Sequence, residues 1–431
     1  MDERMQFLAA VMRGEEGMAA LCRAYEISRK TGYKWLARYK EEGGVGLTER
    51  SRAPRTHPQA VSAAVEATVL AARAAHPTWG PRKLLAWLAP QAHQTASAPV
   101  AAGAGAPVAA GAVLPVASTV GVLLRRAGLV VPRRRRQHTP RWTAPLAHAD
   151  AGGPNAVWCA DFKGQFRTGD GALCYPLTIT DACSRFLLRC QGEPAIDGTR
   201  VQALFDATFR EFGLPLTIRT DNGAPFASTG VGGLSRLSVW WLKLGITPER
   251  IAPGRPDQNG RHERMHRTLK KETAVPPFGP AATLRAQQDR FDAFRTEFNT
   301  ERPHEALGQV PPATLYSPSL RPYPTRLREL EYPHADAVRQ VRQNGELRWH
   351  GQLIFLSESL AGEPVGLTAL ADERYWQVTF GPLVLGVLDL ARGRIQRPSA
   401  RPLPPRPNGG NDKNERNEAH TMSGTIDKIR P

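Results

Sequence analysis

The pattern of apolar and polar residues changes character twice along the 431-residue chain. Residues 4–42 carry apolar side chains at the three-to-four spacing of helices. From residue 156 onward, alternating runs predict β-strands separated by amphipathic helices. After residue 333, short strands follow one another between glycine-rich and charged turns. We therefore expect a multidomain protein with an all-α N-terminal region, an α/β core with a mixed sheet, and a small β-barrel at the C-terminal side.

The helix predicted over residues 28–42 has two unlike faces. Trp35, Leu36 and Tyr39 recur at the spacing of a buried face, and Ser28 is a plausible N-cap. A recognition helix of a helix-turn-helix needs this arrangement, with one face for the core and one for the major groove. A three-helix domain with a solvated basic face is the alternative interpretation. The residues expected to contact DNA here are Ser28, Arg29, Lys30, Thr31, Lys34 and Arg38.

A second helical region is predicted over residues 59–131. Its helices, expected at 61–75, after Trp79-Gly80-Pro81, and at 118–127, resemble a second helix-turn-helix. They are interrupted at 89–115 by an Ala/Pro/Gly-rich insertion, which we interpret as flexible. A compact basic cluster follows, and such a cluster suits phosphate contacts or a solvated linker. Its members are Arg133, Arg134, Arg135 and Arg136.

Three carboxylates are placed where the predicted core could bring them together. Asp161 lies in the first predicted strand, Asp221 ends the fourth, and Glu263 lies on a helix beyond. If these strands are neighbours, both aspartates share one sheet edge, and a helical glutamate can face them. Mg²⁺ prefers oxygen ligands, and two ions can hold the attacking and leaving oxygens of a phosphodiester. Separate structural roles, such as a turn at Asp221 or a helix ion pair at Glu263, remain open from spacing alone.

Several ordered motifs resemble one known family. Val157-Trp-x-x-Asp161, Thr220-Asp-Asn-Gly-x-Pro-Phe226 and Arg255-Pro-x-x-Asn-Gly-x-x-Glu-Arg264 are similar to the integrase-core motifs of DDE transposases. More narrowly, they resemble those of bacterial insertion-sequence transposases with an N-terminal helix-turn-helix. The motifs Ile27-Ser-Arg-x-Thr-Gly-Tyr-Lys-Trp-Leu36, Trp79-Gly-Pro-Arg-Lys83 and Asn299-x-x-Arg-Pro-His-x-Ala-Leu307 match the same group. The resemblance covers roughly residues 5–320.

The resemblance implies a ribonuclease-H-like fold and a transposase activity. Asp161, Asp221 and Glu263 would be the catalytic and metal-binding triad for two Mg²⁺ ions, for which Mn²⁺ could substitute. The activity would be end cleavage and strand transfer of a mobile element. The partners would be its terminal inverted repeats, target DNA and further copies of the chain. The expected DNA contacts on the helix of Glu263 are Arg264, His266, Lys270 and Lys271.

Three features depart from the family pattern. Forty-one residues separate Asp221 from Glu263, more than the thirty-five usual in the superfamily, and the excess is expected in the loop 228–236. Glu249 and Glu272 are therefore alternative third ligands. Glu26 stands where relatives often have glycine in the helix-turn-helix turn. The third departure is the insertion at 89–115.

Composition supports a nucleic-acid partner. Lys and Arg number 57 against 40 Asp and Glu, giving a net charge of +17 and a pI near 10.2. The five cysteines form no CxxC pair, as expected of a reduced intracellular chain. The uncharged stretch 95–124 contains three prolines and is a poor membrane span. We expect a soluble, cytoplasmic, nucleoid-associated bacterial protein with no membrane partner.

Two other function classes remain as hypotheses. His262-Glu263-Arg-Met-His266 matches the HExxH signature of zinc peptidases, in which two His bind zinc and Glu acts as base. No third His follows at metzincin spacing, and so cationic a helix suits zinc poorly, so we interpret the match as accidental. A catalytically inactive or domesticated copy that regulates through DNA binding would share every basic feature.

The predicted organisation can be given by residue range. It comprises a helix-turn-helix domain at 1–42, a linker at 43–58, the second helix-turn-helix-like region at 59–131, a basic linker at 132–152, the catalytic core at 153–320, a β-rich domain at 321–396 and a disordered tail at 397–431.

Overall fold

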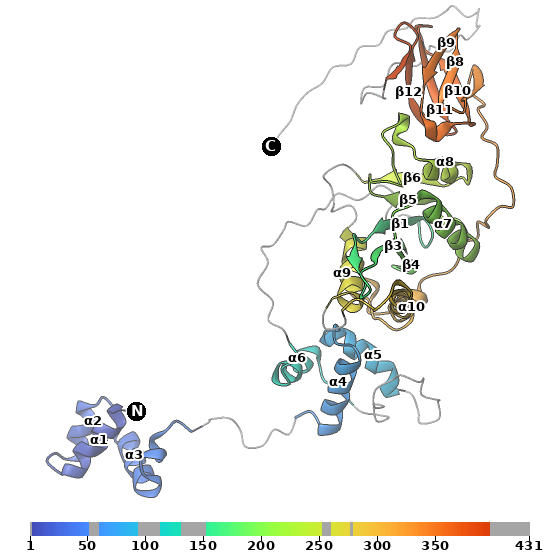
Figure 1. Ribbon diagram of the computed structural model, residues 1–431. Helices are drawn as coiled ribbons and strands as arrows, with labels where there is room; N and C mark the ends of the chain where they lie inside the picture. The colour runs from blue at the N-terminus through green and yellow to red at the C-terminus, as the bar shows by residue number, and fades with distance from the viewer. Residues whose placement is uncertain are drawn as a thin grey trace, which may run out of the picture. The chain divides into compact units, whose positions relative to one another are not determined.

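The computed structural model describes residues 2–50, 60–93, 113–130, 152–251, 260–275 and 279–396. The chain divides into two compact units, Met1–Ala63 and Ala64–Pro431 (Figure 1). The basic cluster expected at 133–136, most of the expected insertion and the expected tail lie outside the described residues.

The first unit is a small helical domain. Its helices are α1 (Asp2–Arg13), α2 (Met18–Ala24) and α3 (Arg29–Glu42), followed by the 3₁₀ helix η1 (Gly43–Leu47). Phe7, Leu21 and Cys22 are buried in its core, and the apolar face of α3 packs on them. Leu47 is also buried there, so η1 is part of the domain although the sequence placed it in a linker.

The turn between α2 and α3 has a left-handed residue. Glu26 adopts a φ of 52°, a conformation that costs an L-residue roughly 1–2 kcal/mol and that glycine adopts freely. Ser28 then caps α3, because its Oγ accepts the backbone N–H of Thr31 at 3.1 Å. The departure noted at Glu26 thus falls on the one turn position that favours glycine.

A second helical module opens the larger unit. It consists of α4 (Ala63–Ala75), α5 (Pro81–His93) and α6 (Ala117–Arg126). Trp79, in the connection between α4 and α5, is fully buried among Val69, Leu84 and Leu124. Helix α5 continues through Pro90 to His93 and so extends into the insertion predicted to begin at residue 89. We call α4–α6 the second helical module.

The core is built on a mixed sheet of six strands. The strands are β1 (Val157–Phe162), β2 (Phe166–Arg167), β3 (Leu173–Asp181), β4 (Leu187–Glu193), β5 (Thr217–Thr220) and β6 (Thr247–Arg250). Their order is β2-β3-β1-β5-β6, with β4 also paired to β3. β3 is antiparallel to both β1 and β4, whereas β1, β5 and β6 are parallel. Three antiparallel strands followed by parallel ones form the ribonuclease-H-like arrangement.

Helices cover both faces of this sheet (Figure 1). On one face, Trp158 and Ile179 pack against α7 (Gly198–Phe212) and α8 (Arg236–Lys243). On the other face, Cys174 and Cys190 pack against α9 (Gly260–Thr273) and α10 (Leu284–Thr300). Because side chains alternate along a strand, Asp161 and Cys159 point to the α9 face while Trp158 points to α7.

The C-terminal side contains antiparallel sheets. The strands are β7 (Ala337–Gln340), β8 (Glu346–Trp349), β9 (Gln352–Phe355), β10 (Pro364–Ala369), β11 (Tyr375–Phe380), β12 (Leu383–Asp389) and β13 (Arg394–Gln396). Five form a sheet in the order β13-β12-β11-β10-β7, and β8 and β9 form a hairpin. The prediction of successive short strands in this region is confirmed. Among the described strands, no pairing between β7 and β13 closes the sheet, so closure into a barrel is not seen.

No helix in the described ranges combines the length and apolarity that a bilayer crossing requires.

Candidate active site

The strand register places Asp161 and Asp221 side by side. In the parallel pair of β1 and β5, Cys159 lies opposite Arg219. Two residues further along each strand are Asp161, near the end of β1, and Asp221, directly after β5. Adjacent strands are about 4.8 Å apart, so both carboxylates lie at the same edge of the sheet. The first and fourth predicted strands are thus neighbours, which is the condition under which both aspartates share one edge.

Helix α9 brings Glu263 into range of the same edge. Burial raises the pKa of Asp161 from 3.8 to about 7, and the negative charges of Asp221 and Glu263 act in the same direction. Backbone hydrogen bonding at Phe162 and the charge of Lys163 oppose this rise. Asp161 therefore interacts with both other carboxylates. A buried carboxyl whose ionised form is disfavoured by two neighbouring carboxylates is electrostatically suited to a cation.

Both histidines of α9 point into the protein, where they contact β3. His262 places Nε2 2.8 Å from the Thr178 hydroxyl and Nδ1 2.8 Å from the Thr180 hydroxyl. His266 places Nε2 2.6 Å from the Thr178 hydroxyl, and its Nδ1 lies 3.8 Å from Oδ2 of Asp161. Because Thr178 lies opposite Asp161 in the β1–β3 register, this network ties α9 to the strands beside the carboxylates.

The buried network consists of neutral imidazoles. Burial lowers the pKa of His262 to about 3. Burial, together with the charges of His262 and Lys163, also lowers the pKa of His266 far below its ordinary value. The expectation that His266 contacts DNA is therefore wrong, since this side chain is only 2% exposed and faces the sheet.

The cationic side chains of α9 do face solvent. Arg264, Lys270 and Lys271 are exposed on the helix that carries Glu263. Their positions are compatible with phosphate contacts beside the carboxylates, because Lys and Arg on an accessible helix face attract the DNA backbone.

The HExxH match does not form a zinc site in this geometry. Asp161, His262 and His266 hold potential ligand atoms within 4.8 Å of one another. A zinc ligand must offer an imidazole lone pair at about 2.0–2.1 Å from the metal. Both ring nitrogens of His262 are instead at hydrogen-bonding distance from threonine hydroxyls. The histidines therefore fit a structural hydrogen-bond network better than a metal centre.

The two alternative third ligands are engaged elsewhere. Glu249 on β6 pairs with the guanidinium of Arg219 on β5, with nitrogen–oxygen distances of 2.9 and 3.1 Å. Glu272, at the other end of α9, pairs with Arg302 at 2.8 and 2.9 Å. Of the three glutamates considered, Glu263 is the one whose charge acts on Asp161.

Asp181 has a structural role beside the candidate site. It is 1% exposed, and its carboxylate accepts the backbone N–H groups of Asn155 and Ser184, both at 2.7 Å. It pairs with Trp158 in the strand register, three positions from the level of Asp161. Asp221 has a local role as well, because its Oδ1 accepts the N–H of Gly223 at 3.1 Å in the turn that follows β5.

The enlarged spacing before Glu263 includes a loop that packs on the C-terminal domain. Leu234 is fully buried in the apolar cluster of that domain together with Leu385. Gly232 and Gly233 have φ values of 64° and 65°, and a Cβ on Gly233 would lie 2.0 Å from the guanidinium of Arg250. The loop 228–236, which was expected to hold the extra residues, therefore contacts both the core and the C-terminal strands.

The expected DNA-binding residues of α3 differ in exposure. Arg29, Lys30 and Lys34 are exposed, whereas Thr31 and Arg38 are half-buried. Ser28 is exposed and acts as the N-cap. Thr178 and Thr180 were not among the predicted site residues, although their alternation with apolar residues in β3 places them on one face.

Family models match two parts of the chain. Models described as integrase core domain match residues 151–256 and 244–312. A helix-turn-helix domain model matches residues 3–55, and a homeodomain-like domain model matches residues 31–99.

Curated relatives come from insertion elements. An uncharacterized 31.7 kDa protein of insertion element IS407 from Burkholderia multivorans is 30% identical over 192 residues, covering 44% of this chain and 65% of the relative. An uncharacterized 39.2 kDa protein of IS476 from Xanthomonas euvesicatoria is 30% identical over 162 residues, covering 37% of this chain and 44% of the relative. The chain thus spans less than two thirds of either relative.

Solved structures with some likeness include two from retroviruses. The HTLV-2 integrase catalytic core domain in complex with magnesium is 14% identical, with a TM-score of 0.29, covering 38% of this chain and 97% of that one. A simian T-cell lymphotropic virus intasome in complex with PP2A regulatory subunit B56 gamma is 16% identical, with a TM-score of 0.33, covering 62% and 93%. On the family models and the insertion-element relatives together, the chain contains a region similar to integrase core domains and, on its N-terminal side, regions similar to helix-turn-helix domains, and it is similar to proteins of bacterial insertion elements.

Proposed function

We propose that this protein is a DDE-type transposase that cleaves the ends of a mobile DNA element and joins them to target DNA. One observation carries the proposal. Asp161 and Asp221 share a sheet edge at the same level, and the charges of Asp221 and Glu263 both act on the buried Asp161 carboxyl. The match to integrase-core models over residues 151–312 supports the same reaction class.

The donor set fits a hard divalent cation. The three proposed ligands offer carboxylate oxygens, which Mg²⁺ and Mn²⁺ prefer, and the elevated pKa of Asp161 indicates negative charge that a cation would stabilise. Asp161, Asp221 and Glu263 would hold the metal. Two bound Mg²⁺ ions would supply Lewis-acid stabilisation of the attacking and leaving oxygens.

The chain's own residues would hold the site in shape and orient the DNA. The contacts of His262 and His266 with Thr178 fix α9 against β3, and so hold Glu263 relative to Asp161. The exposed cations Arg264, Lys270 and Lys271 would contact backbone phosphates. No side-chain nucleophile is required, because water attacks in end cleavage and a DNA 3′-OH attacks in strand transfer.

The N-terminal helices would recognise DNA. Helix α3, with exposed Arg29, Lys30 and Lys34, would read the terminal inverted repeats, and the second helical module would add a further DNA contact. Paired ends would call for more than one copy of the chain.

We further propose that β7–β13 act as one domain over residues 321–396, with the β8–β9 hairpin completing a barrel-like arrangement.

The test is metal-dependent nicking. Purified full-length protein is incubated with labelled duplexes tiled across the DNA that flanks its reading frame, with Mg²⁺, with Mn²⁺ or with EDTA. Nicking that is confined to particular duplexes and requires metal is the expected result. Binding without nicking under every metal condition would instead favour a DNA-binding regulator.

A further inference from the structure

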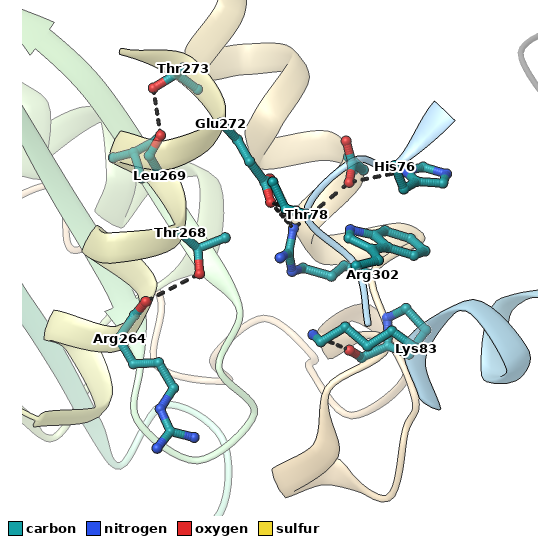
Figure 2. A network of polar contacts seen from close by, with 12 residues as sticks. His76, Thr78, Lys83, Arg264, Thr268, Leu269, Glu272, Thr273 and Arg302 are labelled. Carbon is teal, nitrogen blue, oxygen red and sulfur yellow. Dashed lines mark hydrogen bonds and ion pairs between the residues drawn. The ribbon is translucent and has the colours of Figure 1, made fainter. Parts of the chain in front are cut away.

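The second helical module contacts the core through a nearly buried polar junction. Glu272, in the last turn of α9, receives a hydrogen bond from the hydroxyl of Thr78 in the α4–α5 connection. The guanidinium of Arg302, just after α10, donates to both oxygens of the same carboxylate at 2.8 and 2.9 Å. Figure 2 shows Glu272 pointing from α9 toward Thr78 and Arg302. One carboxylate therefore accepts donors from two parts of the chain.

Arg302 also reaches the core of the second helical module. Its guanidinium carbon lies 5.7 Å from the ring centre of Trp79, the fully buried tryptophan of that module. The side chains of Arg302 and Glu272 are only 7% and 11% exposed. A desolvated ion pair depends on both partners, because removal of one leaves an uncompensated buried charge. The second helical module contacts both members of the pair, Glu272 through Thr78 and Arg302 through Trp79.

Two further contacts come from the start of α5. The amine of Lys83 donates to the carbonyl of Pro303 at 2.6 Å, and burial lowers the pKa of this amine to about 8. Arg82 pairs with Glu305 at 2.9 Å, but both side chains are about 70% exposed (72% and 69%). Exposed pairs contribute little to stability, so Arg82 offers a natural control.

Helix α9 connects this junction to the carboxylates. Glu272 follows Glu263 by nine residues, which is about 13 Å along the axis and half a turn around it at 1.5 Å and about 100° per residue. The helix is held on α10, since Leu269 packs with Phe291 and the Gln287 amide donates to the Thr273 carbonyl at 3.2 Å. A single braced helix thus presents one glutamate to the proposed metal site and another to the second helical module.

We propose that Glu272 and Arg302 are positioning residues, which hold the second helical module on α9 so that DNA bound by the module meets the carboxylate cluster in one register. This inference rests on the proposed function. A purely structural role would predict that the variants lose every activity in proportion to the folded fraction. A positioning role predicts that the site of cleavage becomes less defined while nicking itself persists.

The first arm of the test does not depend on activity. Hydrogen exchange is compared in the full-length wild type, Glu272→Gln, Arg302→Gln, the double variant and Thr78→Val, with Arg82→Ala as control. Amides at 78–84 and 270–274 are expected to exchange at least tenfold faster in the three ion-pair variants and less so in Thr78→Val, with β1 and β5 unchanged. Because the two residues act as one unit, the double variant should exchange no faster than either single variant.

The second arm maps cleavage on a duplex that the wild type nicks, beside a nonspecific plasmid in Mn²⁺. In Glu272→Gln and Thr78→Val, cuts are expected to spread to neighbouring phosphodiesters, and the ratio of end-specific to plasmid nicking should fall about tenfold. Plasmid nicking and DNA affinity should stay within twofold. Unchanged exchange, or equal loss of both kinds of nicking, overturns the inference. If the wild type nicks nothing, the proposed function fails, and the exchange arm still decides whether the junction holds the module.

Discussion

Replacing Asp161 by asparagine should stabilise the metal-free protein at neutral and higher pH. The pKa of this carboxyl is raised from 3.8 to about 7, chiefly by burial and then by the charge of Asp221. A carboxyl with a raised pKa in the folded state disfavours folding once it ionises. The wild type therefore loses stability from this group as pH rises from about 4 to about 7. Asp161→Asn keeps the shape and removes the charge.

The magnitude follows from the same pKa. A rise from 3.8 to about 7 corresponds to about 4 kcal/mol at about 1.4 kcal/mol per pH unit, which is an upper bound. Asp161 is 18% exposed, and water at that edge reduces the repulsion, so we expect about 2 kcal/mol. Metal should act in the opposite direction. Mg²⁺ at ten times its Kd adds about 1.4 kcal/mol to the wild type and much less to Asp161→Asn.

The assay is urea unfolding followed by tryptophan fluorescence, which reports on the core through the buried Trp158 and Trp241. Wild type, Asp161→Asn and the surface control Asp289→Asn are compared at pH 4.5 and pH 8, in EDTA and in Mg²⁺. The advantage of Asp161→Asn should appear at pH 8 in EDTA and shrink at pH 4.5, and Asp289→Asn should follow the wild type. Two results would refute the reasoning. The first is that Asp161→Asn is less stable than the wild type at pH 8 in EDTA, and the second is that Mg²⁺ stabilises Asp161→Asn as much as it stabilises the wild type.

Three further predictions address other parts of the chain. Glu26→Gly should stabilise the first unit by about 1 kcal/mol, because φ there is 52°, and should slow amide exchange in α3 about fivefold; faster exchange would count against it. Lys30→Ala should reduce the slope of the logarithm of the DNA-binding constant against the logarithm of salt concentration by about one, which corresponds to one phosphate contact. Arg13→Ala, which lies on α1 and not on α3, should leave this slope unchanged. His262→Ala should destabilise the core by about 2–4 kcal/mol, because it leaves a cavity, removes the partner of the Thr180 hydroxyl and removes one of the contacts of Thr178, and metal analysis of the wild type should find no stoichiometric zinc; bound zinc that is lost in the variant would restore the peptidase hypothesis.

Much of the core was predictable because its strands and helices carry strong local patterns. The alternation over residues 172–181 and the amphipathic pattern over 199–212 predict β3 and α7 to within a few residues of their observed bounds. Asp161 and Asp221 could be placed together because each ends a run of buried strand residues. Glu26 was noted in the sequence because relatives often have glycine there, and its positive φ gives the physical reason.

Other features depend on contacts that local patterns do not encode. His266 looked like a DNA ligand because it stands among cations, yet it shares the helical stripe of Met265 and Leu269, and that spacing could have indicated burial. The packing of Leu234 on the C-terminal domain and the pairing of Glu272 with Arg302 join segments far apart in sequence. A single chain's periodicity contains no signal for such pairs.

The central claim is that three carboxylates form one metal-dependent nicking site. The direct measurement is the nicking rate, in Mg²⁺ and Mn²⁺, of wild type, Asp161→Asn, Asp221→Asn, Glu263→Gln and the control Asp289→Asn on the duplex that the wild type cuts. We predict at least a thousandfold loss in each of the three triad variants, with DNA affinity within threefold of wild type and full activity in the control. Wild-type nicking by any one of the triad variants would contradict the account.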